Sequence, residues 1–82
     1  MIPRIKIAEP REDYKLYIVF DSGEEVIYDV NEDIAQIPDF SVLKTECGLF
    51  QSFQLDESRT CISWTDRVDL PSDTLLEYGK KI

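Results

Sequence analysis

The sequence predicts a small α+β domain with two layers, in which an antiparallel sheet packs against short helices. Three observations favour this fold class. Two stretches alternate apolar and polar residues on either side of a turn, which is typical of β-hairpins. A weaker alternation near the N-terminus indicates one further short strand. Apolar residues at helical spacing occur in the middle of the chain and near its C-terminus, beside residues that favour helix ends.

The length of the chain limits its organisation. Its 82 residues are enough for one domain, residues 1–82, and too few for a deep active-site cavity. The first strand of this domain is expected from Ile5 to Ala8, where Pro10 stops a weak alternation.

The stretch YKLYIVFDSGEEVIYDV, residues 14–30, predicts the first hairpin. A two-residue turn would place Leu16 opposite Asp29, an apolar residue beside a charged one. A three-residue turn at 21–23 pairs apolar residues on one face and places Lys15 opposite Asp29 on the other. The sequence therefore predicts the three-residue turn, with Gly23 in the left-handed conformation of a β-bulge. The pairs it implies are Tyr14–Val30, Leu16–Tyr28, Ile18–Val26 and Phe20–Glu24.

The middle of the chain changes character. A helix is expected from Pro38, with Asp39 accepting hydrogen bonds from its first backbone amides and Gly48 ending it. A second short helical turn is expected over residues 49–52. The residues expected on the buried side of the first helix are Phe40, Leu43 and Cys47.

A second hairpin is expected around a turn at residues 56–59, because apolar residues alternate before and after it. With a loop of two or of four residues, the same apolar side chains share one face: Phe53, Leu55, Ile62 and Trp64. The stretch LPSDTLLEYGKKI then predicts a terminal helix over Ser72–Tyr78, with Ser72 as its cap and Gly79 as its end.

The chain is acidic. It has 17 Asp and Glu against 9 Lys and Arg, a formal net charge of −8. Nucleic-acid binding needs clustered basic residues, so no direct binding to nucleic acid is expected. The same charge would attract a basic protein partner, although surplus carboxylates also serve solubility. Because no stretch is apolar enough for a signal peptide or a membrane span, the two isolated cysteines indicate a reduced, cytoplasmic protein that does not bind membranes.

Three aspartates near the C-terminus are the first candidate site. Asp66, Asp69 and Asp73 could hold a hard cation, but their spacing differs from that of a calcium loop, which needs oxygens at alternate positions. The simpler interpretation is structural. Asp66 lies in a turn, Asp69 braces the chain before the helix, and Asp73 complements the helix dipole.

Candidates for catalysis are equally weak. The chain has no histidine, so Cys61 lacks the usual proton acceptor, and no Lys or Arg adjoins it to lower its pKa. The acid pairs Glu24–Glu25 and Asp56–Glu57 fall at the tips of the predicted hairpins, where water keeps carboxylates ionised. The sequence therefore predicts no catalytic, cofactor-binding or metal-binding residues, and a protein that is not an enzyme.

Aromatic residues offer an alternative role in binding. Trp64 is expected in the core, since it shares the apolar face of the second hairpin. Tyr17 and Ile27 fall on the face of the first hairpin opposite its core residues, and would be exposed together unless something covers them. The terminal helix, a partner protein or a second copy of the chain could do so.

Several landmarks resemble a bacterial domain of unknown function, DUF2442, over nearly the whole chain. The family pattern runs Leu-x-Val-x-Phe-x-x-Gly-x-x-x-x-Tyr-Asp, then Phe-x-x-Leu and Leu-Phe, and closes with Trp and a spaced Asp-Leu. The matching residues are Leu16, Ile18, Phe20, Gly23, Tyr28, Asp29, Phe40, Leu43, Leu49, Phe50, Trp64, Asp69, Leu70, Asp73 and Leu75. The chain departs from the pattern after Trp64, where Thr65 and Arg67 replace the usual Pro and Gly and the proline before the helix is Pro71.

This resemblance implies an α+β fold and supplies no catalytic residues. Some family members are similar to the N-terminal part of proteins with a helix-turn-helix domain. Others resemble small partners encoded beside another short protein, as in toxin–antitoxin pairs. The expected function is a non-enzymatic protein-interaction module, as the acidic, antitoxin-like partner of a small basic protein or as a homo-oligomer. The alternative is a transcription-associated accessory domain or a small-ligand sensor.

Overall fold

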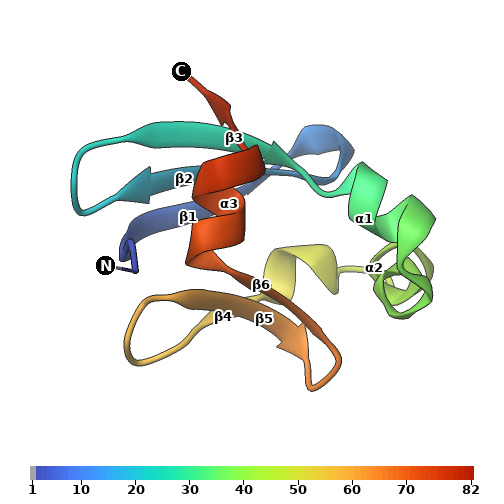
Figure 1. The fold of residues 1–82 in the computed structure, drawn as a ribbon. Coiled ribbons are helices and arrows are strands. Elements are labelled where there is room, and N and C mark those ends of the chain that lie inside the picture. Colours follow the sequence, from blue (N-terminus) through green and yellow to red (C-terminus); the bar gives the residue numbers. More distant parts are fainter. Residues whose placement is uncertain (1) are drawn as a thin grey trace.

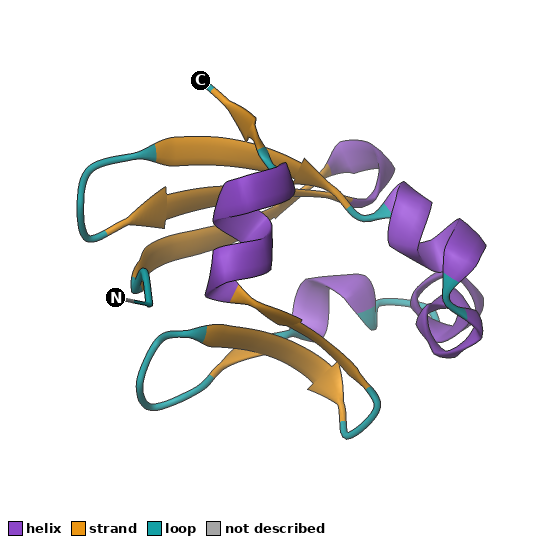
Figure 2. Cartoon of the chain, viewed as in Figure 1, coloured by secondary structure: helices purple, strands orange, loops and turns teal. Residues whose placement is uncertain are grey.

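Two antiparallel sheets form the frame of the protein in a computed structural model that describes residues 2–82. The first sheet has the order β1-β2-β3-β7, and the second has the order β4-β5-β6. Figure 1 shows the sheets one above the other, with α3 between them and α1 and α2 at the end away from the N-terminus. Strands and short helices occur in separate runs along the chain (Figure 2), and the α+β fold class is confirmed.

The bounds of the elements are as follows. The strands are β1 (Ile5–Arg11), β2 (Lys15–Phe20), β3 (Glu25–Asp29), β4 (Gln54–Leu55), β5 (Cys61–Thr65), β6 (Val68–Pro71) and β7 (Lys80–Lys81). The α-helices are α1 (Asn31–Gln36), α2 (Val42–Thr45) and α3 (Ser72–Tyr78). Three 3₁₀ segments lie at Glu12–Tyr14, Pro38–Ser41 and Phe50–Ser52.

The first hairpin has the predicted register. Lys15 pairs with Asp29, Leu16 with Tyr28 and Ile18 with Val26. The amide of Phe20 donates to the Glu24 carbonyl (2.9 Å), and Gly23 has a φ of 94°. The three-residue turn and the left-handed glycine are both confirmed.

The first strand is longer than predicted. β1 runs from Ile5 to Arg11 and passes through Pro10, which pairs with Leu16. Because β1 is the edge strand of its sheet, the missing N–H of Pro10 need not break the ladder. The expectation that Pro10 stops the strand was therefore wrong.

The second hairpin forms a sheet of its own. Leu55 pairs with Ile62 and Gln54 with Ser63, so the predicted face is confirmed. A third strand, β6, adds to β5 through a turn at Asp66 and Arg67 and was not predicted. The alternation of buried Val68 and Leu70 around exposed Asp69 was the available signal for it. Asp69 lies within this strand and does not brace a turn.

The middle segment contains one helix that the sequence did not predict. α1 covers Asn31–Gln36, before the expected helix start at Pro38. From Pro38 the chain forms a 3₁₀ segment and then α2, and the side chain of Asp39 makes no capping hydrogen bond. Phe40 is buried as expected, but Cys47 is exposed.

The terminal helix α3 has the predicted bounds but different end contacts. Ser72 does not cap it; its buried hydroxyl donates to the Pro3 carbonyl (2.6 Å) and ties the helix to the N-terminal segment. At Gly79 a Cβ would lie 2.4 Å from the Leu75 carbonyl oxygen and 3.0 Å from the Val26 Cβ. A side chain at this position would clash with the end of α3 and with β3, so only glycine fits here.

The core lies between the two sheets. It contains Ile18 and Val26 from the first sheet, Ile62 from the second and Leu75 from α3, all with no exposed surface. Trp64 is half-buried beside this core and donates from its indole nitrogen to the Phe50 carbonyl (2.9 Å). Its ring packs against three phenylalanines, Phe40, Phe50 and Phe53. The interpretation of Trp64 as a packing residue is confirmed.

None of the helices formed by residues 2–82 has the length and apolar character needed to cross a membrane.

Candidate protein-interaction surface

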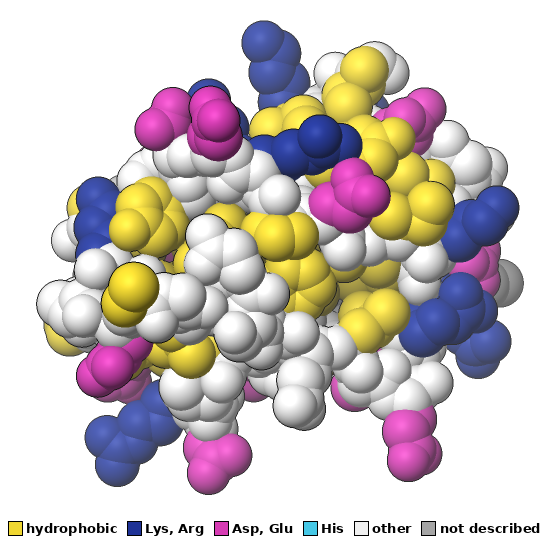
Figure 3. Space-filling model, turned by 180° about the vertical axis from the view of Figure 1, so that it is seen from behind, with side chains coloured by type: hydrophobic (Ala, Val, Ile, Leu, Met, Phe, Trp, Pro, Cys, Tyr) yellow, Lys and Arg dark blue, Asp and Glu magenta, His cyan; other side chains and the backbone are white. Residues whose placement is uncertain are grey.

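The first sheet has one buried face and one exposed face. Side chains alternate along each strand, so Tyr17, Val19 and Ile27 point away from the core formed by their neighbours. Ile7 pairs with Val19 and extends this row onto β1, where its side chain is 42% exposed. We call the row of Ile7, Val19, Tyr17 and Ile27 the outer sheet row. Figure 3, seen from behind, shows hydrophobic side chains at the surface among charged ones.

The terminal helix does not cover the outer sheet row. Leu75 of α3 is fully buried in the core, and Gly79 lies against Val26, which points to the inner face of the sheet. The helix is therefore on the opposite side of the sheet from Tyr17 and Ile27, which are both half-buried. The sequence expectation of an apolar pair on this face is confirmed.

Charged side chains hold Tyr17 in place within this row. The Arg11 guanidinium lies over its ring, 4.9 Å from the centroid, and its hydroxyl donates to Glu25. The hydrogen bond to Glu25 raises the pKa of the Tyr17 hydroxyl, because it stabilises the protonated form. The Tyr17 side chain is thus held by two charged neighbours, and it remains partly exposed at the surface.

A groove of about 380 Å³ opens at the far end of β3, between α1 and α3. Its acidic residues are Asp29 at the end of β3 and Glu32 and Asp33 in α1. Its other lining residues are Ile27, Tyr28, Gln36, Thr74, Tyr78 and Lys80. We call it the acidic groove. Tyr78 stands at its side with 72% of its surface exposed, an unusual position for a large aromatic side chain.

The electrostatics of the groove favour cations. The Tyr28 hydroxyl donates to Asp33 (2.6 Å), and its pKa is raised by burial, by this hydrogen bond and by the nearby charges of Glu32 and Asp29. Lys80 is the one cationic residue among the groove's lining residues. A guanidinium or ammonium group entering here would meet three carboxylates and could stack on the exposed Tyr78 ring.

The groove and the outer sheet row form one continuous surface. Ile27 belongs to both, and Lys80 pairs with Ile27 across the strands and so points to the same face. Asp29 lies two residues beyond Ile27 on that face. The result is an apolar strip with an acidic hollow at its end, a combination found in binding surfaces with an apolar centre and a polar rim.

The structure does not bring the three predicted aspartates together as a site. Asp66 lies in the β5–β6 turn, Asp69 in β6 and Asp73 in the first turn of α3. Among residues 2–82, no group of three acidic or cysteine side chains is placed to hold a metal ion. Asp66 lies in a turn and Asp73 at the start of α3, as the structural interpretation of these residues predicted.

The other candidates also have structural roles. Cys61 lies in β5, where burial raises the pKa of its thiol and so disfavours the reactive thiolate. Asp56 accepts hydrogen bonds from the Ser58 hydroxyl and from the amides of Thr60 and Cys61, which lower its pKa and close the loop. Glu25 accepts a hydrogen bond from the Tyr17 hydroxyl.

Sequence reasoning found one half of this surface and missed the other. Tyr17 and Ile27 were visible from strand periodicity. The acidic groove was not, because it combines residues 27–36 with residues 74–80 and depends on an unpredicted helix.

The fold and this surface define a small α+β domain with an apolar strip and an acidic groove on one side. Comparison with protein families gives a more specific result: residues 5–81 match the model described as protein of unknown function DUF2442. The chain belongs to this family. No curated protein and no solved structure matches it.

Proposed function

We propose that this protein is a non-enzymatic protein-interaction module that binds a basic partner protein. The observation that carries the proposal is the acidic groove joined to the outer sheet row. An apolar strip alone would suit many partners, whereas the three carboxylates at its end select for a positively charged one.

The two parts of the surface contribute differently to binding. Burial of Ile7, Val19, Tyr17 and Ile27 supplies affinity, at about 25 cal/mol for each Å² of apolar surface removed from water. The carboxylates of the groove and the overall charge of −8 attract the partner and orient it. Among single side chains, we expect Tyr78 to contribute most to the free energy of binding, because exposed tyrosines commonly become binding hot spots.

The partner we propose is a small basic protein that is occluded by this chain, as an antitoxin occludes its toxin. The surplus of acidic residues supports this role. The absence of histidine and the raised pKa of the Cys61 thiol support a module that acts by binding and not by catalysis.

The test begins with any short basic protein that is encoded beside this chain. Each is purified and titrated with the wild-type protein by calorimetry at two salt concentrations. We expect one of them to bind, and to bind more weakly at higher salt because the attraction is screened. Glu32→Gln and Tyr78→Ser should each weaken this binding about tenfold. Both side chains are exposed, so the fold should be unaffected.

Glu57→Gln is the matched control, since Glu57 is an exposed acid in the loop of the second hairpin, away from the groove. It removes the same charge and should change the affinity by less than about twofold. Equal affinity for wild type and both groove variants would contradict the proposal. So would a stable dimer that dissociates on Ile27→Ser, because a second copy would then cover the surface.

A further inference from the structure

A second and larger hollow lies at the other end of the first hairpin. Its volume is about 860 Å³, within the range of about 300–1,000 Å³ typical of small-molecule sites. Three separate segments line it: the N-terminal segment, the turn of the first hairpin and the loop of the second hairpin. The lining residues are Ile2, Pro3, Arg4, Phe20, Asp21, Ser22, Ser58 and Thr60. We call it the N-terminal pocket.

Hydrogen bonds fix the walls of this pocket. The Pro3 carbonyl accepts from the Ser72 hydroxyl (2.6 Å), and the Arg4 carbonyl accepts from the Asp21 amide (2.9 Å). The Ile5 amide donates to the Arg59 carbonyl (2.7 Å), which joins the N-terminal segment to the second hairpin. A pocket built from segments held in this way is largely formed before a ligand arrives, which lowers the entropy cost of binding.

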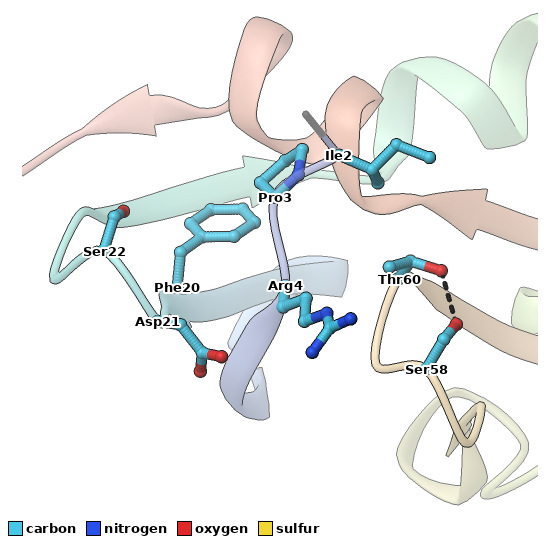
Figure 4. A pocket seen from close by; sticks show the side chains of 8 residues that line it. All are labelled: Ile2, Pro3, Arg4, Phe20, Asp21, Ser22, Ser58 and Thr60. Carbon is cyan, nitrogen blue, oxygen red and sulfur yellow. Dashed lines mark hydrogen bonds between the residues drawn. The ribbon is translucent and has the colours of Figure 1, made fainter.

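The charges of the pocket do not cancel. Arg59 binds Asp21 through both of its terminal nitrogens (2.9 and 2.8 Å), so this carboxylate is already neutralised. Arg4 has no carboxylate of residues 2–82 within ion-pair distance. Figure 4 shows the Arg4 side chain extending from the N-terminal segment toward Ser58 and Thr60. The uncompensated charge of the pocket is therefore a guanidinium.

The hydroxyl groups of Ser58 and Thr60 bind within the protein, so Arg4 is the charged donor of the pocket. Ser58 donates to Asp56 (2.7 Å), and its oxygen lies 2.7 Å from that of Thr60. Since the Ser58 proton goes to Asp56, Thr60 is the donor in this pair, and neither proton remains for a ligand. Ser22 also lines the pocket, and its hydroxyl oxygen accepts from the Glu24 amide (3.5 Å). The apolar lining residues are Ile2, Pro3 and Phe20, of which Pro3 and Phe20 lie side by side in Figure 4.

We propose that the N-terminal pocket binds a carboxylate with an apolar body. The carboxylate pairs with the Arg4 guanidinium, whose planar fork matches two carboxylate oxygens. The apolar body lies against Ile2, Pro3 and Phe20. Such a group is carried both by a free medium-chain carboxylic acid and by the C-terminal residue of a peptide. The site is independent of the acidic groove, because the two lie at opposite ends of the first hairpin.

Two probes distinguish these sources of the carboxylate. Octanoate represents the free acid, and the peptide acetyl-Gly-Gly-Leu with a free C-terminus represents the peptide end. Octanol and the C-terminal amide of the same peptide lack the charge. Each is titrated into the ¹⁵N-labelled full chain, and the amide signals of Arg4, Ser22 and Thr60 are followed.

We expect a saturable shift of these signals with octanoate, with the peptide acid, or with both, and at least tenfold weaker binding of the uncharged analogues. Arg4→Gln should weaken binding of the acid about tenfold or more. Lys6→Gln, which removes a nearby exposed cation that does not line the pocket, should leave it unchanged. Ile2→Ser should weaken it to a smaller extent.

Three results would overturn the proposal. One is the absence of saturable shifts with either acid. Another is equal binding of acid and uncharged analogue. The third is wild-type affinity in an Arg4→Gln variant whose melting curve shows that it is folded.

Discussion

The two hairpins of this protein make their turns by different means. The turn of the first hairpin depends on its backbone: Gly23 adopts a φ of 94°, and a Cβ there would meet no atom within 4 Å. The loop of the second hairpin contains no glycine, and Arg59 takes the left-handed conformation with a φ of 59°. Its loop is instead held by side chains, with Asp56 accepting from the amides of Thr60 (2.8 Å) and Cys61 (3.1 Å).

This difference has a structural consequence. The conformation of the first turn follows from Gly23 and the register of its strands, and Asp21 also connects this turn to Arg4 and Arg59. The second is coupled to the rest of the fold, because Arg59 bonds to Asp21 in the first turn and to the Ile5 carbonyl (3.3 Å). A left-handed conformation of a residue other than glycine costs about 1–2 kcal/mol and persists where surrounding contacts hold it. The second loop thus joins the two sheets at the same place where the N-terminal pocket forms.

The largest effect should come from truncating the core beneath each hairpin. Ile18→Ala in the first sheet and Ile62→Ala in the second should each lower the free energy of unfolding by about 2–5 kcal/mol, because both side chains are fully buried. If the chain is one domain, each variant unfolds in a single transition in urea, and hydrogen exchange accelerates in both sheets. Protection that survives in the unmutated sheet would show two independent units.

A smaller effect is expected in the backbone-determined turn. Gly23→Val should lower the free energy of unfolding by about 1–2 kcal/mol, because valine disfavours a positive φ. The cost is conformational and not steric, since the position is open. Ser22→Ala, in the same turn, should change stability by less than about 0.5 kcal/mol. An unchanged melting temperature for Gly23→Val would contradict the assigned turn.

In the loop that side chains hold, a substitution to glycine has two opposing effects on stability, which should nearly cancel. Arg59→Gly relieves the left-handed conformation but removes the ion pair with Asp21, in which both side chains are about 40% exposed. Exposed ion pairs contribute about 0–1 kcal/mol, so the net change should stay within about 1 kcal/mol in denaturant titrations. If Arg59→Gly lowered the free energy of unfolding as much as truncation of a buried residue does, Arg59 would be essential for joining the sheets.

The smallest effect is expected in the pH dependence of the protein's stability. Hydrogen bonds from Ser58, Thr60 and Cys61 lower the pKa of Asp56 in the folded protein. Its stabilising contribution is therefore present above the unfolded-state pKa of about 4 and is lost as the pH falls through the lower folded-state pKa. Asp56→Asn should flatten the acid side of a melting-temperature profile, and Ser58→Ala should reduce the slope partially. A slope below pH 4 that is identical in Asp56→Asn and wild type would contradict this assignment.

Parts of the fold were predictable because their signals are local. Alternation of apolar residues sets the register of the first hairpin and the shared face of the second, and a slip of one residue would expose the core. The helix Ser72–Tyr78 was equally predictable from the sequence. Helix α1 was not, since its one apolar side chain packed against the core is Ile34. It is held by distant contacts such as the bond from the Asn31 side chain to the Asp13 carbonyl (2.6 Å).

By itself the sequence determined the α+β class, the register of the first hairpin, the shared apolar face of the second, the packing role of Trp64 and the position of Tyr17 and Ile27 on the outer face of the first sheet. The tertiary structure decided that the hairpins form two sheets, that α3 covers the inner face, and that separate segments meet in the acidic groove and the N-terminal pocket. The reason is the range of the interactions. Strand and helix periodicity acts over a few neighbouring residues, whereas both hollows arise from segments that approach only when the core closes.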